Sequence, residues 1–69
     1  MLASEVTRQR FAEWSFEFDR NYKGMYPRKM PWGEIPQDER ELYLEDADRY
    51  LKMPVEQWPV EIQKRLVVL

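Results

Sequence analysis

The spacing of apolar residues predicts a long helix in the first third of the chain. Residues 4–23 contain no Gly or Pro, and large apolar side chains recur there about once per helical turn. This stripe consists of Val6, Phe11, Trp14, Phe18 and Tyr22. Ser4 suits the N-cap position, and Gly24 suits the position where a helix stops. We therefore expect a helix over residues 4–23 whose stripe faces the core, with Phe16 lying off that stripe.

A stretch that is rich in Pro and Gly follows over residues 24–35. Two Pro and two Gly exclude a regular helix there. The same stretch carries four large apolar side chains, which are Met25, Tyr26, Met30 and Trp32. Because side chains of this kind favour burial, we expect a packed loop.

The pattern over residues 36–52 is also helical. Pro36 suits the first helical position, and Asp38 and Glu39 fall in the first turn, where the helix dipole favours carboxylates. One face of this segment carries Tyr43, Ala47, Tyr50 and Leu51. We expect this second helix to pack against the first.

The last part of the chain predicts a short third helix. Its apolar residues have helical spacing, and they are Val55, Trp58, Ile62, Leu66 and Leu69. Pro59 interrupts this spacing, so we expect a turn over residues 54–58 and a helix over residues 59–67. Residues 67–69 form either the end of this helix or an extended tail. In both cases they have to pack on this core or on a second copy of the chain.

Together these patterns predict an all-α fold of three helices in a single small domain, residues 1–69. A chain of 69 residues buries roughly 60% of its unfolded surface, which suffices for one core. No repeat or linker divides the chain. We expect these core residues: Phe11, Trp14, Phe18, Tyr22, Trp32, Ile35, Tyr43, Ala47, Leu51, Trp58, Ile62 and Leu66.

The chain has no His and no Cys, and this narrows its chemistry. Zinc sites built on Cys or His, disulfides, thiol nucleophiles and Ser-His triads are all excluded. The sequence has only two Ser and one Thr, and it has no Gly-rich phosphate loop. We therefore expect no catalytic residues, no metal and no cofactor. Aromatic residues, 14% of the chain, have to supply much of the core instead.

Nothing in the sequence predicts membrane insertion or export. The longest apolar runs are too short to span a bilayer. The first residues lack the basic and apolar regions of a secretory signal. We expect a cytoplasmic protein.

The formal charge of −2 hides three regions of different sign. Residues 1–33 carry six bases and four acids, residues 34–48 seven acids and one base, and residues 49–69 four bases and two acids. The net charges are therefore +2, −6 and +2. Within the acidic region, Glu41, Glu45 and Asp48 share one helical face. Without a calcium-binding loop, this face predicts a solvated surface or a docking surface for a basic partner rather than a metal site.

The predicted loop places two bases between two aromatic residues. Arg28 and Lys29 lie between Tyr26 and Trp32. Such an arrangement can hold a nucleic-acid strand by phosphate contacts and by stacking on the bases. Two bases on a net acidic chain attract phosphates only weakly, so the sequence favours protein binding. Nucleic-acid binding through residues 26–32 is the alternative function.

The stretch over residues 32–47 is the most patterned part of the chain. Trp32 and Ile35 flank the predicted helix start, and we expect them to fold back on Tyr43 as a hydrophobic staple. The stretch resembles the start of the third helix of high-mobility-group boxes, which reads W-x-x-L-S-x-x-E-K-x-x-Y-x-x-x-A. The matching positions are Trp32, Ile35, Glu39, Arg40, Tyr43 and Ala47. That family bends DNA, but none of its DNA-contacting residues has a match here, so the resemblance implies a shared helix start.

The same stretch, in a small chain without Cys, also resembles small proteins of bacteriophages, especially those that infect actinobacteria. This resemblance implies a protein that binds and modulates a host protein in the host cytoplasm. The predicted function is therefore a non-catalytic protein–protein interaction module, with a homodimeric or larger structural assembly as a further alternative. Because Trp, Tyr and Arg dominate binding hot spots, we expect aromatic and basic contact residues. They are Phe16, Tyr26, Arg28, Lys29 and Trp32.

Overall fold

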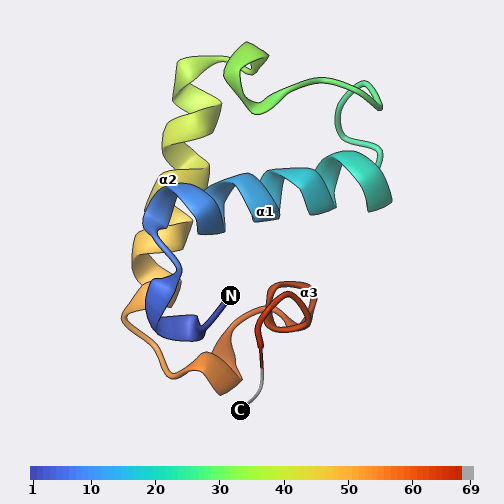
Figure 1. Cartoon of the computed structure of the whole chain (residues 1–69). Helices are drawn as coiled ribbons and strands as arrows, with labels where there is room; N and C mark the ends of the chain where they lie inside the picture. The colour runs from blue at the N-terminus through green and yellow to red at the C-terminus, as the bar shows by residue number, and fades with distance from the viewer. Residues whose placement is uncertain (68–69) are drawn as a thin grey trace.

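The computed structural model describes residues 1–67 and confirms the all-α fold with three helices. The α-helices are α1 (Arg8–Tyr22), α2 (Gln37–Leu51) and α3 (Val60–Gln63). Three single turns of 3-10 helix precede them: η1 (Ala3–Glu5), η2 (Trp32–Glu34) and η3 (Val55–Gln57). Figure 1 shows α1 crossing α2, with α3 on the C-terminal segment that returns toward α1. The first helix is therefore the central element, because both other helices pack against it.

The first helix begins later than the sequence predicts. Thr7, not Ser4, is the N-cap, and its hydroxyl oxygen accepts a hydrogen bond from the Arg10 backbone N–H at 3.1 Å. The preceding residues form η1, where the Glu5 carboxylate accepts from the Leu2 N–H at 2.9 Å. The chain is extended at Val6, whose side chain is buried in the core. The expected start at residue 4 is wrong because burial of Val6 requires a break between η1 and α1.

The first helix ends where the sequence predicts. Gly24 adopts a positive φ of 65°, a conformation that costs other residues more than Gly. The turn brings two backbone N–H groups, those of Lys23 and Met25, to the carbonyl oxygen of Asp19 at 3.2 and 3.3 Å. These bonds satisfy a carbonyl that the end of the helix would otherwise leave without a partner.

The buried stripe of α1 differs from the predicted one. The residues buried on α1 are Phe11, Ala12 and Phe16. Phe16 was expected off the stripe but is only 1% exposed, whereas Tyr22 was expected in the core and is 74% exposed. Phe18 stacks on Tyr22, with ring centroids 5.1 Å apart. Because α1 carries Phe16 on one side and the stripe of Trp14, Phe18 and Tyr22 on another, spacing alone does not decide which side α2 covers.

The core has two adjoining parts. One is a cluster of buried residues from all three helices and from the segments that precede α1 and α3: Val6, Phe11, Ala12, Ala47, Trp58 and Ile62. The other consists of aromatic rings around Phe16. Burial is confirmed for five of the predicted core residues: Phe11, Ile35, Ala47, Trp58 and Ile62. Six more are half-buried: Trp14, Phe18, Trp32, Tyr43, Leu51 and Leu66.

The predicted packing of the Pro- and Gly-rich stretch is confirmed for three of its four large apolar side chains, because Tyr26, Met30 and Trp32 are half-buried. Figure 1 shows the loop between α1 and η2 running from the C-terminal end of α1 back to the start of α2. The Arg20 guanidinium donates to the carbonyl oxygen of Met30 at 2.8 Å, and Tyr26 packs its ring on Phe16. Met25, which we expected to be buried, is 59% exposed. The loop is therefore anchored at two points that follow its exposed methionine.

The start of α2 follows the predicted staple. Trp32 and Tyr43 pack their rings edge to face at 5.9 Å, and Ile35 is buried. Pro36 lies one position earlier than expected: it is the N-cap, and its carbonyl oxygen accepts from the Arg40 N–H at 3.0 Å. The predicted helix over residues 36–52 is thus confirmed to within one residue at each end.

The third helix is shorter than the predicted 59–67, because it ends at Gln63. The Arg65 and Leu66 N–H groups then donate to carbonyls three residues back, which closes tight turns. Next, the Val67 N–H donates to the Met1 carbonyl oxygen at 2.9 Å and ties the two chain ends together. The expectations for residues 68 and 69 lie outside the described residues. Within residues 1–67, no helix combines the length and apolar character needed to cross a membrane.

Candidate functional site

Phe16 lies at the centre of an aromatic cluster and is not available to a partner. Its ring contacts Tyr26, Trp32 and Tyr43, with centroid distances of 5.0, 5.9 and 6.0 Å. All three contacts have the edge-to-face geometry that aromatic pairs favour. The prediction that Phe16 is an exposed contact residue is therefore wrong.

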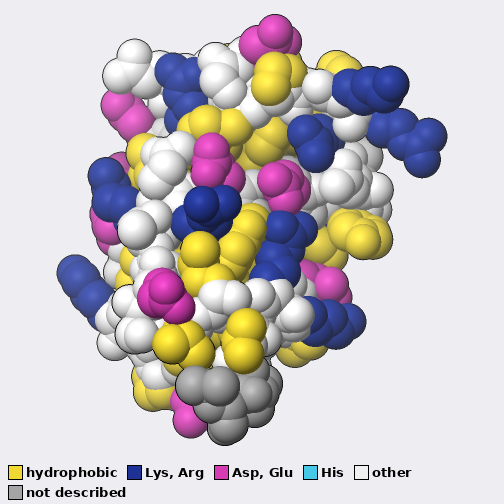
Figure 2. All heavy atoms as spheres, viewed as in Figure 1, with side chains coloured by type: hydrophobic (Ala, Val, Ile, Leu, Met, Phe, Trp, Pro, Cys, Tyr) yellow, Lys and Arg dark blue, Asp and Glu magenta, His cyan; other side chains and the backbone are white. Residues whose placement is uncertain are grey.

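The loop bases are exposed, but the two neighbouring aromatics turn inward. Arg28 and Lys29 are exposed, and neither makes an ion pair with any described residue. Figure 2 shows basic side chains projecting at the upper right, over this loop. Tyr26 and Trp32 pack against Phe16 instead of flanking the bases. The loop therefore offers positive charge without the stacking surfaces that single-stranded nucleic acid needs.

The predicted acidic face on α2 is divided by a base from α1. Arg8 donates two hydrogen bonds of 2.8 Å to the Asp48 carboxylate, and this contact raises the pKa of the Arg8 guanidinium. Glu41 accepts from the side chain of Gln37 at 3.3 Å, and Glu45 shares a shallow hollow with Arg8. Within residues 1–67, no group of acidic side chains is arranged to hold a metal ion.

A different set of carboxylates, which we did not predict as a site, lies between α1, α2 and the loop. Two tyrosine hydroxyls hold them. Tyr43 on α2 donates to Asp19 on α1 at 2.5 Å, and Tyr26 in the loop donates to Glu39 on α2 at 3.0 Å. On the other side of Asp19, the Lys23 ammonium lies 3.5 Å from the carboxylate.

These contacts keep both tyrosines protonated. Burial and the hydrogen bond to Asp19 raise the pKa of the Tyr43 hydroxyl far above its ordinary value. For Tyr26, the contact with Tyr43 lowers the pKa, but burial and the Glu39 carboxylate raise it by more. Both hydroxyls therefore act as neutral hydrogen-bond donors.

The carboxylates line a groove that we call the acidic groove. Its volume is about 340 Å³. It is lined by Asp19 of α1, Met25 and Tyr26 of the loop, and Glu39, Leu42, Tyr43 and Asp46 of α2. The lining contains three carboxylates and no Lys or Arg.

A second hollow adjoins the acidic groove on the side of α3. It has a volume of about 240 Å³ and shares Asp19, Tyr43 and Asp46 with the groove. Ile62 and Tyr50 contribute to its apolar wall. The residues of the Asp19–Tyr43 hydrogen bond therefore line both hollows.

Two exposed apolar side chains give the acidic groove its other property. Leu42 is 63% exposed and Met25 is 59% exposed, although both are large and apolar. They come from different elements and line the same groove. Together they give the groove a small apolar part beside its carboxylates.

The sequence contained a signal for half of this groove. Glu39, Leu42, Tyr43 and Asp46 have the spacing i, i+3, i+4 and i+7, which places them on one face of α2. The other half depends on how α1 and the loop return to that face, so Asp19 and Met25 were not recognisable from spacing.

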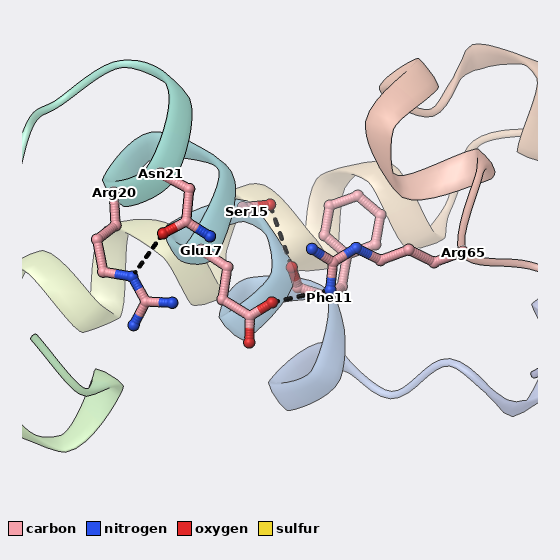
Figure 3. Close-up of polar contacts among 6 residues, drawn as sticks. All are labelled: Phe11, Ser15, Glu17, Arg20, Asn21 and Arg65. Carbon is pink, nitrogen blue, oxygen red and sulfur yellow. Dashed lines mark hydrogen bonds and ion pairs between the residues drawn. The ribbon is translucent and has the colours of Figure 1, made fainter. Parts of the chain in front are cut away.

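The face of α1 that lies against the segment after α3 serves packing. Figure 3 shows Arg65 reaching from the turn after α3 to Glu17 on α1, where an N–O distance of 2.8 Å marks an ion pair. The same guanidinium lies over the Trp14 ring, with its central carbon 5.4 Å from the ring centroid. The hydroxyl of Ser15 is occupied as well, because it donates to the Phe11 carbonyl oxygen at 3.1 Å.

No protein-family model, no curated protein and no solved structure matched this chain in comparisons with known proteins. The functional interpretation therefore rests on the groove itself: three carboxylates, two neutral hydroxyl donors and two exposed apolar side chains.

Proposed function

We propose that this chain is a non-catalytic protein-binding module and that it binds its partner through the acidic groove. The observation that carries the proposal is the pair of exposed apolar side chains, Met25 and Leu42, in one groove. Both are largely exposed in the folded chain, although apolar side chains of this size contribute most to stability when they are buried. A partner that covers them removes that apolar surface from water.

The rigidity of the groove supports the proposal. The hydrogen bond between Tyr43 and Asp19 joins α1 to α2, and the one between Tyr26 and Glu39 joins the loop to α2. The groove walls are therefore held before a partner arrives. A surface that is ordered in advance loses less conformational entropy on binding.

The available side chains support binding rather than catalysis. The sequence has no His or Cys, and the hydroxyls of Thr7 and Ser15 are engaged with the backbone of α1. The two tyrosines in the groove have raised pKa values, so at neutral pH they do not act as bases.

A site-directed photocrosslinking experiment tests this function. The purified protein, with benzoylphenylalanine in place of Leu42, is irradiated in an extract of the cells that produce it. We expect a discrete adduct with one protein. We expect this adduct to disappear when the crosslinking protein also carries the substitution Met25→Ser. The control carries the same crosslinker at Gln9, an exposed α1 residue outside the groove.

Two outcomes would contradict the proposal. One is the absence of any adduct at position 42 while circular dichroism shows a folded protein. The other is an equal yield of the same adduct from position 9, which would indicate collision rather than binding in the groove.

A further inference from the structure

The acidic groove also carries information about the chemistry of the partner. We propose that it binds a basic, amphipathic segment of the partner protein, with an Arg or Lys side chain among Asp19, Glu39 and Asp46 and an aliphatic side chain against Met25 and Leu42. This inference rests on the proposed function and names the class of segment that the groove would take.

The first step is the charge of the lining. Three carboxylates face the groove, and no Lys or Arg belongs to its lining. Two of them, Asp19 and Glu39, take their hydrogen bonds from tyrosine hydroxyls. A neutral donor orients a carboxylate without cancelling its charge, so these two hydrogen bonds leave the carboxylates able to attract a cation.

The second step concerns the bases that lie nearest. Lys23 pairs with Asp19 at 3.5 Å, and Arg49 pairs with Asp46 at 2.9 Å. Arg49 and Asp46 are both mostly exposed, and surface pairs of this kind contribute little to stability. The Lys23 side chain is mostly exposed too, whereas the Asp19 side chain is only 17% exposed. An incoming guanidinium or ammonium can therefore displace Arg49 from Asp46 at small cost.

The third step is the apolar part of the groove. Leu42 and Met25 are available for an aliphatic side chain that adjoins the cation. Methionine adapts its shape to different neighbours, which suits a wall of a binding groove. A segment that alternates basic and aliphatic residues satisfies both parts of the groove at once.

The same charges argue against a nucleic-acid ligand in this groove. Phosphates dominate nucleic-acid affinity, and three carboxylates repel them. The exposed bases of the loop, Arg28 and Lys29, lie outside the groove lining. A basic protein segment is therefore the occupant that the charges favour.

Labelled peptides test the inference directly. The probe is a short fluorescent peptide with two Arg-Leu pairs, and its counterpart has Glu in place of Arg. Fluorescence anisotropy at low salt should show saturable binding of the Arg-Leu peptide and no binding of the Glu-Leu peptide. Binding should weaken as salt is added, because screening reduces the attraction between the charges.

Matched variants locate the binding. Asp46→Lys reverses one charge in the groove, and Glu45→Lys makes the same change on α2 outside it. We expect Asp46→Lys to weaken binding about tenfold or more and Glu45→Lys to have a much smaller effect. For the apolar part, Leu42→Ser should weaken binding, whereas Val60→Ser, at a similarly exposed position on α3, should not.

The outcomes separate the inference from the proposed function. If the crosslinker at position 42 captures a partner but the Arg-Leu peptide does not bind, the partner chemistry is wrong and the binding function stands. If neither occurs, both are wrong. The inference is also overturned by equal binding of the two peptides, by equal losses in Asp46→Lys and Glu45→Lys, or by a single-stranded oligonucleotide that competes for the groove.

Discussion

The Tyr43 hydroxyl donates a hydrogen bond of 2.5 Å to the Asp19 carboxylate and thereby joins α2 to the last turns of α1. The contact serves two purposes. It satisfies the hydroxyl of a half-buried tyrosine, and it holds a carboxylate in position on the floor of the acidic groove. Four predictions follow from this bond and from the packing around it.

Removing the Tyr43 hydroxyl should destabilise the fold. Tyr43→Phe keeps the ring contacts with Phe16 and Trp32 but leaves Asp19 without its donor. We expect the free energy of unfolding to fall by roughly 1.5–3 kcal/mol, the usual range for a hydrogen bond to a charged group. Urea denaturation followed by circular dichroism measures the change.

Tyr50→Phe is the matched control. The Tyr50 ring stacks on Phe11 at 5.6 Å, and its hydroxyl makes no hydrogen bond with the described residues. This substitution should change the free energy of unfolding by less than about 0.5 kcal/mol. Equal losses in the two variants would show that the Tyr43–Asp19 bond contributes nothing specific.

Stability should decrease at alkaline pH. In the unfolded chain tyrosine ionises at about pH 10. In the folded state the raised pKa of Tyr43 means that its hydroxyl stays protonated above this pH. The stabilisation is therefore fully present below about pH 10 and is lost as the pH rises above that value, because the unfolded state then releases protons that the folded state retains.

The measurement compares urea midpoints at about pH 9 and about pH 11 in the wild type and in Tyr43→Phe. The wild type should lose more stability between these pH values than the variant does. The exposed residue Tyr22 supplies the control Tyr22→Phe, which should behave as the wild type. Parallel pH dependence in all three proteins would contradict the assignment to Tyr43.

Phe16 should behave as a core residue. Truncation to Ala removes a ring that is 1% exposed and contacts three other rings, so we expect a loss of about 3–5 kcal/mol. Tyr22→Ala, on the same helix, removes an exposed ring that stacks on Phe18 and should cost only about 0.5–1.5 kcal/mol. Thermal denaturation measures both.

A loss of this size can unfold so small a domain, so Phe16→Leu provides a second measurement. Leu keeps much of the apolar volume, and this variant should be folded and intermediate in stability. If Phe16→Ala were as stable as Tyr22→Ala, the packing of α1 described above would be wrong.

The two glycines should respond differently to the same substitution. Gly24 has a φ of 65°, so Gly24→Ala places an L side chain in the left-handed region at a cost of about 1–2 kcal/mol. Gly33 has an ordinary φ, and an added Cβ would meet no atom within 4 Å. Gly33→Ala should therefore be neutral or slightly stabilising. Chemical denaturation of both variants checks the difference, and a neutral Gly24→Ala would contradict the role of the turn.

Local patterns were sufficient to predict the helices in order and the limits of α2. The spacing of Tyr43 and Ala47 marks the buried side of α2, and Pro36 together with the acids after it marks the start. The staple between Trp32 and Tyr43 was also predictable, because its partners lie close together in the sequence. These features depend on interactions within a few helical turns.

The start of α1 was not predictable from the same rules. Ser4 and Thr7 are both acceptable N-caps by residue type. The choice of Thr7 depends on burial of Val6 in a core that α2 and α3 complete. Ser4 is an equally good N-cap by residue type, but the burial of Val6 favours Thr7.

The acidic side chains show the same difference between what local spacing predicts and what tertiary packing decides. The sequence showed the acidic region and placed Glu41, Glu45 and Asp48 on one face, but Arg8 from α1 covers part of it. The carboxylates of the acidic groove come from α1 as well as α2. Their grouping depends on where the loop returns, which no local spacing records.

By itself, then, the amino-acid sequence determined the class of fold, the order of the helices, the position of the turn at Gly24 and the absence of His and Cys chemistry. Only the tertiary structure decided which side of α1 is buried, because helix α1 carries aromatic residues on two sides. It buried Phe16, exposed Tyr22 and brought Asp19 to Tyr43. The physical reason is that packing between distant segments selects among faces that local periodicity leaves equivalent.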